Sequence, residues 1–253
     1  MRPALWSNDP MELSAVYDSG REALAALVLD HADRASEPVP ACPAWTVHDV
    51  LAHVVGLASD ATAGTMPEMD LLEQWREPEV AGIRDGMTAG QVARAAHRTV
   101  EELTDGWRAN MASLGPMLDG SVPFPEPVPA GIGAIMVTDL AVHDQDVRTA
   151  LGAPRTADGP AAAIALATYG FGVDYRIRQL GLPALALRFG DRERVLGGGP
   201  AAATVAAERT ELLRVFAGRR SRRQIAALGW TGDPTPYLPV IPAYGERADD
   251  LLD

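Results

Sequence analysis

Lysine is absent from this sequence of 253 residues, so all 22 of its basic side chains are arginines. The 34 acidic residues give a formal net charge of −12. A nucleic-acid partner normally requires a basic face, and the short basic segment Arg219–Arg223 is too small to supply one. We therefore expect no nucleic-acid partner. The missing lysine, with abundant alanine, glycine and proline, is typical of proteins from GC-rich genomes such as those of actinobacteria.

Cysteine and long apolar runs are also scarce. Cys42 is the only cysteine, so no disulfide can form within the chain, and a reducing compartment is the simpler inference. The N-terminal segment lacks the apolar core of a signal peptide, and no uninterrupted apolar run reaches the roughly 18 residues of a membrane span. We expect a cytoplasmic protein with no membrane partner, in which Cys42 has a structural role.

Helical periodicity dominates the first 150 residues. Apolar residues recur at helical spacing in four segments, which we predict as helices at 9–31, from Thr46 onward, at 88–115 and at 129–151. Thr46 and Asp49 form a variant of the capping box at the start of the second helix. The connections between the helices are expected to be irregular. Four long helices with no strand pattern between them favour a helical bundle.

The pattern changes after Gly152. A helix predicted at 160–181 precedes a strand, a tight turn and a second strand in "ALALRFGDRERVLG". A third strand in "ATVAA", two short helices at 207–217 and 221–228, and a proline-rich tail on the surface complete the chain. The sequence therefore predicts an α+β protein with two domains, a helical bundle over residues 1–153 and a smaller α+β domain over residues 154–253.

Ionisable residues interrupt the apolar face of the helix predicted at 129–151. Asp139, His143 and Asp146 fall within about 60° of one another on the helical wheel, in the middle of the apolar stripe. Their burial is unfavourable unless they are paired, hydrogen-bonded or bound to a metal. Asp139 and His143 are four residues apart and can direct both side chains to one metal ion. His53, at the border of the apolar stripe of the second helix, is the best candidate for a third ligand.

Two other interpretations of these residues remain open. In the first, Asp139 or Asp146 orients His143 within a buried hydrogen-bonded network, and the chain is a non-enzymatic ligand-binding or regulatory protein. In the second, the chain is a metal-dependent hydrolase that uses metal-bound water and needs no thiol. The sequence contains no other catalytic motif. It has no phosphate-binding glycine loop, no G-x-S-x-G motif of serine hydrolases and no cysteine pair for zinc.

Three segments resemble the mycothiol-dependent maleylpyruvate isomerase family, a branch of the DinB-like metal-binding bundles. "ACPAWTVHDVLAHVVG" resembles the family's N-terminal signature, in which a Cys-Pro-x-Trp-Thr-Val turn leads into a helix that bears a metal-binding histidine. "DLAVHDQDVRTALG" resembles its fourth-helix pattern, a carboxylate followed four residues later by histidine. "GDPTPYLP" resembles part of the C-terminal domain of many members. The matches occur in the family's order and span nearly the whole chain.

The resemblance implies a DinB-like four-helix bundle with one divalent metal, zinc, held by His53, Asp139 and His143. Asp146 would lie behind these ligands and orient His143 as a hydrogen-bond acceptor. The open metal position would hold a low-molecular-weight thiol, mycothiol in this family, as its thiolate. One position departs from the pattern, because the isomerase for which the family is named has glutamate where this chain has Asp139, which is one methylene shorter. This departure leaves open whether the site is tighter, weaker or closed by a different group such as Asp146.

The activity implied by the resemblance is that of a thiol-dependent isomerase or S-transferase acting on a small anionic electrophile. In the isomerase, addition of the thiolate to a cis double bond permits rotation, and elimination gives the trans product. Arg84 is our candidate for the basic group that anchors the substrate anion. The sequence leaves open the actual substrate, the identity of the metal and the oligomeric state.

Overall fold

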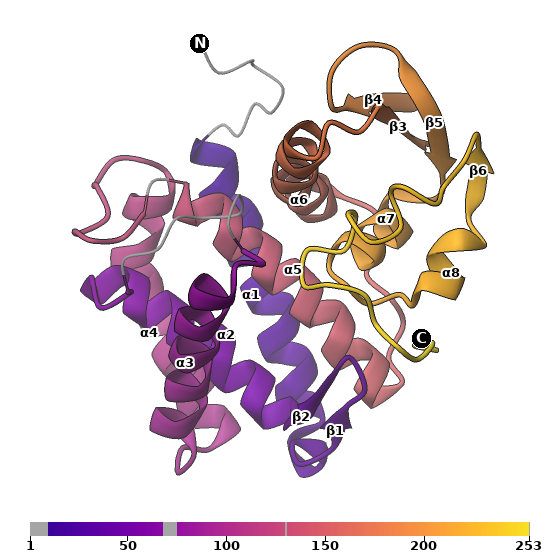
Figure 1. Ribbon diagram of the computed structural model, residues 1–253. Helices are drawn as coiled ribbons and strands as arrows, with labels where there is room; N and C mark the ends of the chain where they lie inside the picture. The colour runs from indigo at the N-terminus through magenta and orange to yellow at the C-terminus, as the bar shows by residue number, and fades with distance from the viewer. Residues whose placement is uncertain (1–9, 68–74, 130, 253) are drawn as a thin grey trace. The chain divides into compact units, whose positions relative to one another are not determined.

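The structure is a computed structural model that describes residues 10–67, 75–129 and 131–252, and its helices and strands confirm the α+β class (Figure 1). The helices are α1 (Pro10–Asp30), α2 (Val47–Ala63), α3 (Pro78–Ala95), α4 (Val100–Leu118), α5 (Ile132–Leu151), α6 (Pro160–Gln179), α7 (Arg209–Phe216) and α8 (Arg222–Ala226). The strands are β1 (Pro38–Val39), β2 (Cys42–Thr46), β3 (Ala184–Phe189), β4 (Arg192–Leu196), β5 (Ala201–Ala206) and β6 (Gly229–Thr231).

The chain divides into two compact units. The first contains Met1–Met69 and Glu79–Ile164, and the second contains Asp70–Pro78 and Ala165–Asp253. The division falls inside α6, later than the domain boundary predicted at residue 153, which stays a prediction. A break in the sequence pattern marks a loop, whereas a continuous helix can pass from one packed unit to the next without any such break.

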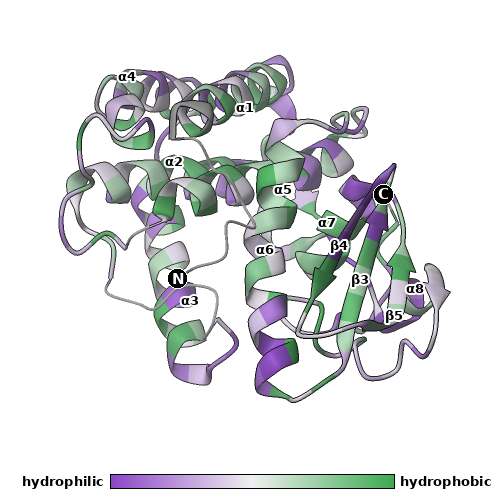
Figure 2. Cartoon of the chain, turned by 90° about the horizontal axis from the view of Figure 1, so that it is seen from above, coloured by the Kyte–Doolittle hydropathy of each residue, from purple (hydrophilic) through white to green (hydrophobic). Residues whose placement is uncertain are grey.

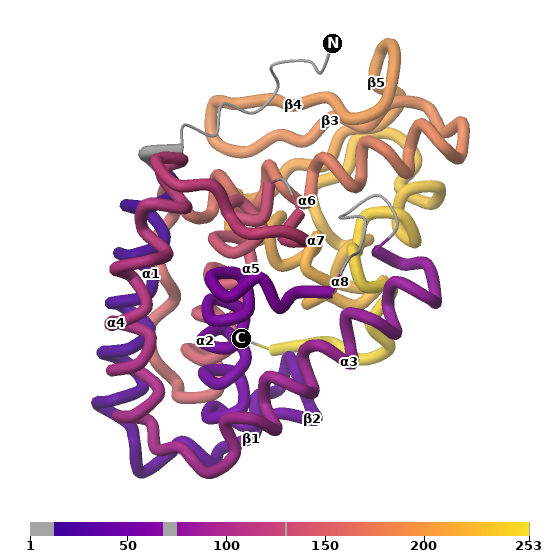
Figure 3. Tube along the Cα trace, turned by 90° about the vertical axis from the view of Figure 1, so that its left-hand side faces the viewer, coloured from indigo at the N-terminus to yellow at the C-terminus, as the bar shows by residue number. Residues whose placement is uncertain are grey.

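Four helices of the first unit pack on one another around its core. Helices α1 and α2 each contact both α4 and α5. Figure 3 shows α1 and α4 side by side, and Figure 2 shows α2 largely in the colour of hydrophobic residues. Trp107 of α4 is fully buried, and its indole N–H donates to the hydroxyl oxygen of Tyr17 on α1 over 3.1 Å. The polar atoms of both aromatic side chains are thereby paired within an apolar core.

The predicted caps of α2 and α5 are present. The Thr46 hydroxyl accepts from the backbone N–H of Asp49, and the Asp49 carboxylate accepts from the backbone N–H of Thr46. Gly152 ends α5 in the left-handed conformation with φ of 66°, which glycine adopts without steric cost. Helix α5 is buried over most of its surface, and even its Thr138 is only 4% exposed and donates to the carbonyl of Ala134.

The prediction of a single helix at 88–115 is wrong, because α3 ends at Ala95 and α4 begins at Val100. Thr99 caps α4 in a complete capping box with Glu102, which explains the break. The sequence contains this Thr-x-x-Glu signal, but helical spacing continues across the turn between the two helices and conceals it.

Helix α3 also replaces the irregular stretch expected up to residue 87. Its first residue is Pro78, and Gly82, Gly86 and Gly90 within its span weaken the helical pattern. Among its residues only Gln91 and Ala95 are buried. The three glycines conceal the helix in the sequence, because glycine disfavours the interior of a helix.

A short hairpin precedes α2, so the expectation of no strands before residue 150 is wrong. Strands β1 and β2 pair antiparallel, with Pro38 opposite Thr46 and Val39 opposite Cys42. Prolines on both strands concealed the hairpin, because proline cannot donate to a ladder and is normally read as a loop residue.

The second unit contains a four-stranded sheet in the order β4-β3-β5-β6. The predicted antiparallel pair of β3 and β4 is confirmed, β5 runs parallel to β3, and β6, which was not predicted, pairs antiparallel with β5. The tail is packed rather than lying on the surface as expected, because Val240 and Ile241 are 4% and 1% exposed and the Tyr237 hydroxyl donates to the carbonyl of Pro183. None of the described helices combines the length and apolarity that crossing a membrane requires.

The cap at Thr99 predicts a measurable loss of stability. Thr99→Ala removes the hydroxyl that accepts from the Glu102 N–H, so the free energy of unfolding should fall by about 1 kcal/mol. Thr99→Ser keeps a hydroxyl acceptor, so the free energy of unfolding should fall by only a few tenths as much as in Thr99→Ala. Urea unfolding followed by circular dichroism measures both, and equal stability of the two variants would contradict the capping role.

Candidate metal centre

The three residues predicted as metal ligands lie together between two packed helices of the first unit. His53 comes from α2, and Asp139 and His143 come from successive turns of α5. The Nε2 atom of His53 is 3.2 Å from Oδ2 of Asp139, and the Nε2 atom of His143 is 3.6 Å from Oδ1 of the same carboxylate. One ligand atom from each of the three residues lies within 4.8 Å of the others.

The environment of these groups is largely dry. His53 and His143 are 4% and 6% exposed, whereas the side chain of Asp139 is 20% exposed. Helix packing thus buries the two imidazoles and leaves the carboxylate at the more open side. A ligand that reaches this cluster would meet the carboxylate and the two Nε2 atoms together.

The second nitrogen of each imidazole is held by a neighbouring acceptor. His53 Nδ1 lies 2.7 Å from Oε1 of Gln91, and His143 Nδ1 lies 3.3 Å from Oδ2 of Asp146, which is fully buried. When Nδ1–H donates to such an acceptor, the lone pair of the neutral ring is on Nε2. Both histidines direct Nε2 toward Asp139, and the role of Asp146 as the acceptor that orients His143 stays a prediction.

The distances within the cluster fit a divalent ion. Ligand atoms about 2.1 Å from a tetrahedral ion are about 3.4 Å from one another. The observed separations of 3.2 and 3.6 Å join the two histidines to different oxygens of Asp139, and the ligand atoms of the three residues lie within 4.8 Å of one another, which is close enough for one ion to reach all three side chains. Direct charge-assisted hydrogen bonds are shorter, about 2.7–2.9 Å. The two nitrogens and the carboxylate oxygen also form a donor set that suits zinc.

The electrostatic field at His143 favours a positive charge. Burial alone would lower the pKa of the His143 imidazole, but the charge of Asp139 and the hydrogen bond to Asp146 outweigh burial and raise this pKa from 6.5 to about 10. In the metal-free protein the ring is therefore protonated at neutral pH and lies between two carboxylates. A metal ion on Nε2 would take the place of that proton.

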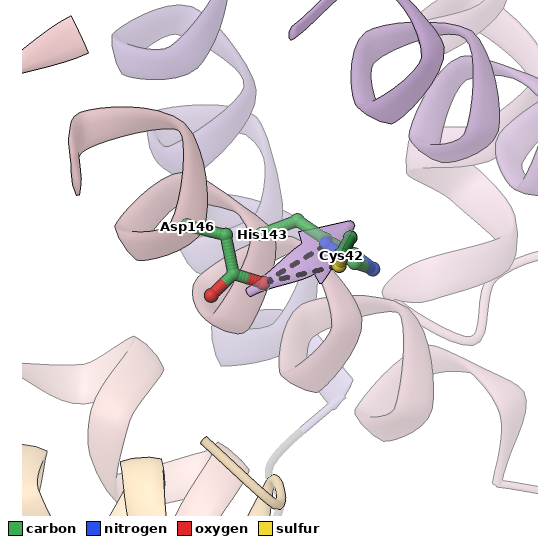
Figure 4. Close-up of side chains that lie close together, drawn as sticks. All are labelled: Cys42, His143 and Asp146. Atoms are coloured by element: carbon green, nitrogen blue, oxygen red, sulfur yellow. Dashed lines mark hydrogen bonds and ion pairs between the residues drawn. The ribbon is translucent and has the colours of Figure 1, made fainter. Parts of the chain in front are cut away.

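The β1–β2 hairpin contributes two further side chains, to which sequence reasoning gave no role in the site. The Trp45 ring centre is 5.1 Å from that of His53 and 5.9 Å from that of His143. The Cys42 thiol is 3.9 Å from Oδ2 of Asp146, and Figure 4 shows it converging with His143 on this one oxygen. Cys42, His143 and Asp146 also lie close enough to one another to bind a metal.

Arg84 lies within α3, and not ahead of a helix as the sequence indicated. Its guanidinium pairs with the carboxylate of the adjacent Asp85, at 3.0 Å from Nε and 2.9 Å from Nη2. A substrate anion would therefore compete with Asp85 for this side chain, and the anchoring role of Arg84 stays a prediction.

The fold and the site define a class of protein, a helical domain with a candidate His/Asp metal centre followed by an α+β unit. Residues 17–148, just over half of the chain, match the family described as the mycothiol maleylpyruvate isomerase N-terminal domain. The chain belongs to this family, which confirms the resemblance found in its sequence. The family is named for an enzyme, and this agrees with the expectation that the chain is one.

Two solved structures share the fold. The mycothiol-dependent maleylpyruvate isomerase matches with a TM-score of 0.55 and a histidine-to-alanine mutant of it with 0.56. Each is 17% identical to this chain, and each match covers 94% of this chain and 97% of the other. At this identity the similarity establishes the fold alone. No curated protein matches the sequence.

The raised pKa of His143 predicts that zinc binding depends on pH. Because Zn²⁺ must displace the His143 proton, its apparent affinity should rise by up to tenfold per pH unit below about pH 10. The same pKa shift stabilises the metal-free fold fully below pH 6.5, and this contribution is lost as the pH rises through about 10. Competition with a chromophoric chelator between about pH 6.5 and 9 measures the affinity.

Calorimetry in two buffers of different ionisation enthalpy counts the released proton. Asp146→Asn removes one of the two carboxylates that raise the pKa of His143 and leaves Asp139, so the rise in affinity should level off at a lower pH. An affinity independent of pH in both proteins would show that no proton on His143 competes with the metal.

Proposed function

We propose that this chain is a metal-dependent isomerase or S-transferase that uses a low-molecular-weight thiol, mycothiol, and binds one zinc ion through His53, Asp139 and His143. The observation that carries the proposal is the position of the Asp139 carboxylate between two Nε2 atoms, with one oxygen near each, in a cluster whose ligand atoms lie within 4.8 Å of one another. Membership of the mycothiol maleylpyruvate isomerase family supports the choice of thiol.

Three protein ligands leave one position of a tetrahedral site open. When bound there, the ion would supply a Lewis acid that keeps the thiol in its reactive thiolate form. The chain's own residues prepare this position. Gln91 and Asp146 hold the two imidazoles from behind, and Trp45 lies against both rings and limits the space open to water.

The shorter side chain of Asp139 is compatible with this assignment. Aspartate here replaces the glutamate of the isomerase for which the family is named, and it still brings one carboxylate oxygen near each histidine. The side chain is also held closer to its own helix, which reduces its freedom to change between binding modes.

We further propose that the substrate is a small anionic electrophile with an activated double bond, as in maleylpyruvate. Addition of the thiolate to such a bond makes it a single bond that can rotate, and elimination returns the free thiol. An S-transferase would stop at the adduct. Arg84 stays our proposed anchor for a carboxylate of this substrate.

His53→Ala should abolish zinc binding and thiol-dependent turnover together while the protein stays folded. The core around α2 does not depend on the ion, since Val50, Leu51 and Val54 of the same helix are buried against its neighbours. His97→Ala is the matched control, because His97 is exposed in the turn between α3 and α4 and should leave binding unchanged. Zinc content, circular dichroism and turnover of maleylpyruvate with and without mycothiol are the measurements.

Each outcome distinguishes the proposal from its alternatives. Zinc-dependent hydrolysis in the absence of any thiol would favour a metal-dependent hydrolase. Unchanged zinc content in His53→Ala, with no turnover by the wild type, would favour a non-enzymatic protein with a structural His/Asp network. Loss of zinc without loss of thiol-dependent turnover would show that the reaction does not require the metal.

Arg84→Ala should raise the KM for an anionic substrate by about tenfold or less, because the pairing with Asp85 already weakens this anchor. The affinity for zinc should not change. Steady-state kinetics of Arg84→Ala beside Arg108→Ala, an exposed arginine of α4 paired with Asp105, measure the effect. Equal KM values in the two variants would show that Arg84 does not bind the substrate anion.

A further inference from the structure

We infer that helix α3 positions the metal ligand His53 through Gln91, which selects the ring tautomer that presents Nε2 to the ion. This inference rests on the proposed metal site for its consequence in metal binding. The hydrogen bonds that carry it are features of the metal-free protein, so they can be tested separately.

Helix α3 contributes little to the apolar core. Of its 18 residues only Gln91 and Ala95 are buried, and Gln91 is 1% exposed. Added Cβ atoms at Gly82 and Gly86 would meet nothing within 4 Å, which shows how loosely the helix is surrounded elsewhere. The best-packed side chain of α3 is thus polar, and it is directed at a histidine.

A chain of hydrogen bonds fixes the direction of the Gln91 amide. Asp60 of α2 is an acceptor only, and its Oδ2 receives the Gln91 Nε2–H₂ group over 2.8 Å. The opposite end of the amide, Oε1, is consequently directed to Nδ1 of His53 over 2.7 Å. Because Oε1 can only accept, Nδ1 must donate, and the neutral His53 ring carries its lone pair on Nε2.

Arg94 completes the chain at the protein surface. Its Nη2 lies 2.8 Å from both carboxylate oxygens of Asp60, and its side chain is 60% exposed. This contact pairs the Asp60 carboxylate with a cation on the side of α3. The order Arg94–Asp60–Gln91–His53 therefore runs from solvent to the metal centre with a defined donor and acceptor at each step.

Gly56 makes the close approach of Gln91 to α2 feasible. A Cβ atom at Gly56 would lie 2.7 Å from Cβ and 2.8 Å from Cγ of Gln91, closer than real Cβ contacts come. Gly56 lies one turn after His53 and one turn before Asp60 on α2. The glycine therefore forms the gap in which the glutamine side chain lies between its two partners.

A merely structural role for Gln91 predicts a different result. If Gln91 only satisfied buried polar groups, its replacement would reduce stability without changing the state of His53 or its affinity for metal. The experiment must therefore read the histidine ring itself as well as the fold.

Gln91→Met replaces the amide with an unbranched side chain of similar length that neither donates nor accepts in its place. We expect zinc affinity to fall by about 10–100-fold, the usual effect of losing the acceptor behind a metal-binding histidine. Gln91→Glu keeps an oxygen for Nδ1–H and should retain most of the affinity. Gly86→Ala, on the exposed face of α3, is the control and should bind zinc as the wild type does.

Nitrogen-15 spectra of the metal-free protein show which ring nitrogen of His53 carries the proton. In the wild type His53 should be in the Nδ1–H form, and in Gln91→Met it should become a mixture of both tautomers. Gly56→Ala should shift His53 in the same direction, because the added methyl displaces Gln91.

An unchanged His53 tautomer in Gln91→Met would overturn the inference even if the protein lost stability. A wild type that binds no zinc would refute the proposed function, while the spectra of the metal-free protein would still decide the role of Gln91. If the tautomer changes in Gln91→Met but zinc affinity does not, Gln91 orients the ring without supporting a metal.

Discussion

The Asp139 carboxylate between two buried imidazoles is the constraint on which the first unit depends. Two histidines and two acidic residues, Asp139 and Asp146, occupy one side of a helix interface that would otherwise be apolar. Such groups are stable there only when each polar atom has a partner or a metal to bind. Asp146 and Gln91 supply partners on the far side of each ring, and this leaves the near side for a ligand.

The surrounding fold supplies what this arrangement needs. The capping box at Thr46 fixes where α2 begins and hence the turn on which His53 lies. Helix α5 is buried on almost every side, which sets the direction of Asp139 and His143 relative to α2. The hairpin in front of α2 adds Trp45 beside both rings. Regular secondary structure therefore holds all the groups that meet at this site.

The parts of the site that obey a helical period could be predicted from the sequence. Asp139, His143 and Asp146 are related by spacings of three and four residues within one helix, and His53 lies at the edge of another apolar stripe. Gln91 and Asp60 could not be recognised in the same way, because they meet across 31 residues and Gln91 belongs to a helix interrupted by three glycines. The hairpin was missed because proline conceals short strands, and the break at Thr99 because helical spacing continues through it.

The scarcity of buried apolar surface on α3 has a consequence for motion. Segments with few buried contacts open at a lower free energy than the global unfolding reaction, so α3 should detach locally while the four packed helices stay intact. Detachment would remove Gln91 and release the His53 ring from its fixed tautomer. The rate at which an ion enters or leaves the centre would then follow the opening of one peripheral helix, and the lifetime of the metal complex could be adjusted by exposed residues that never approach the ion.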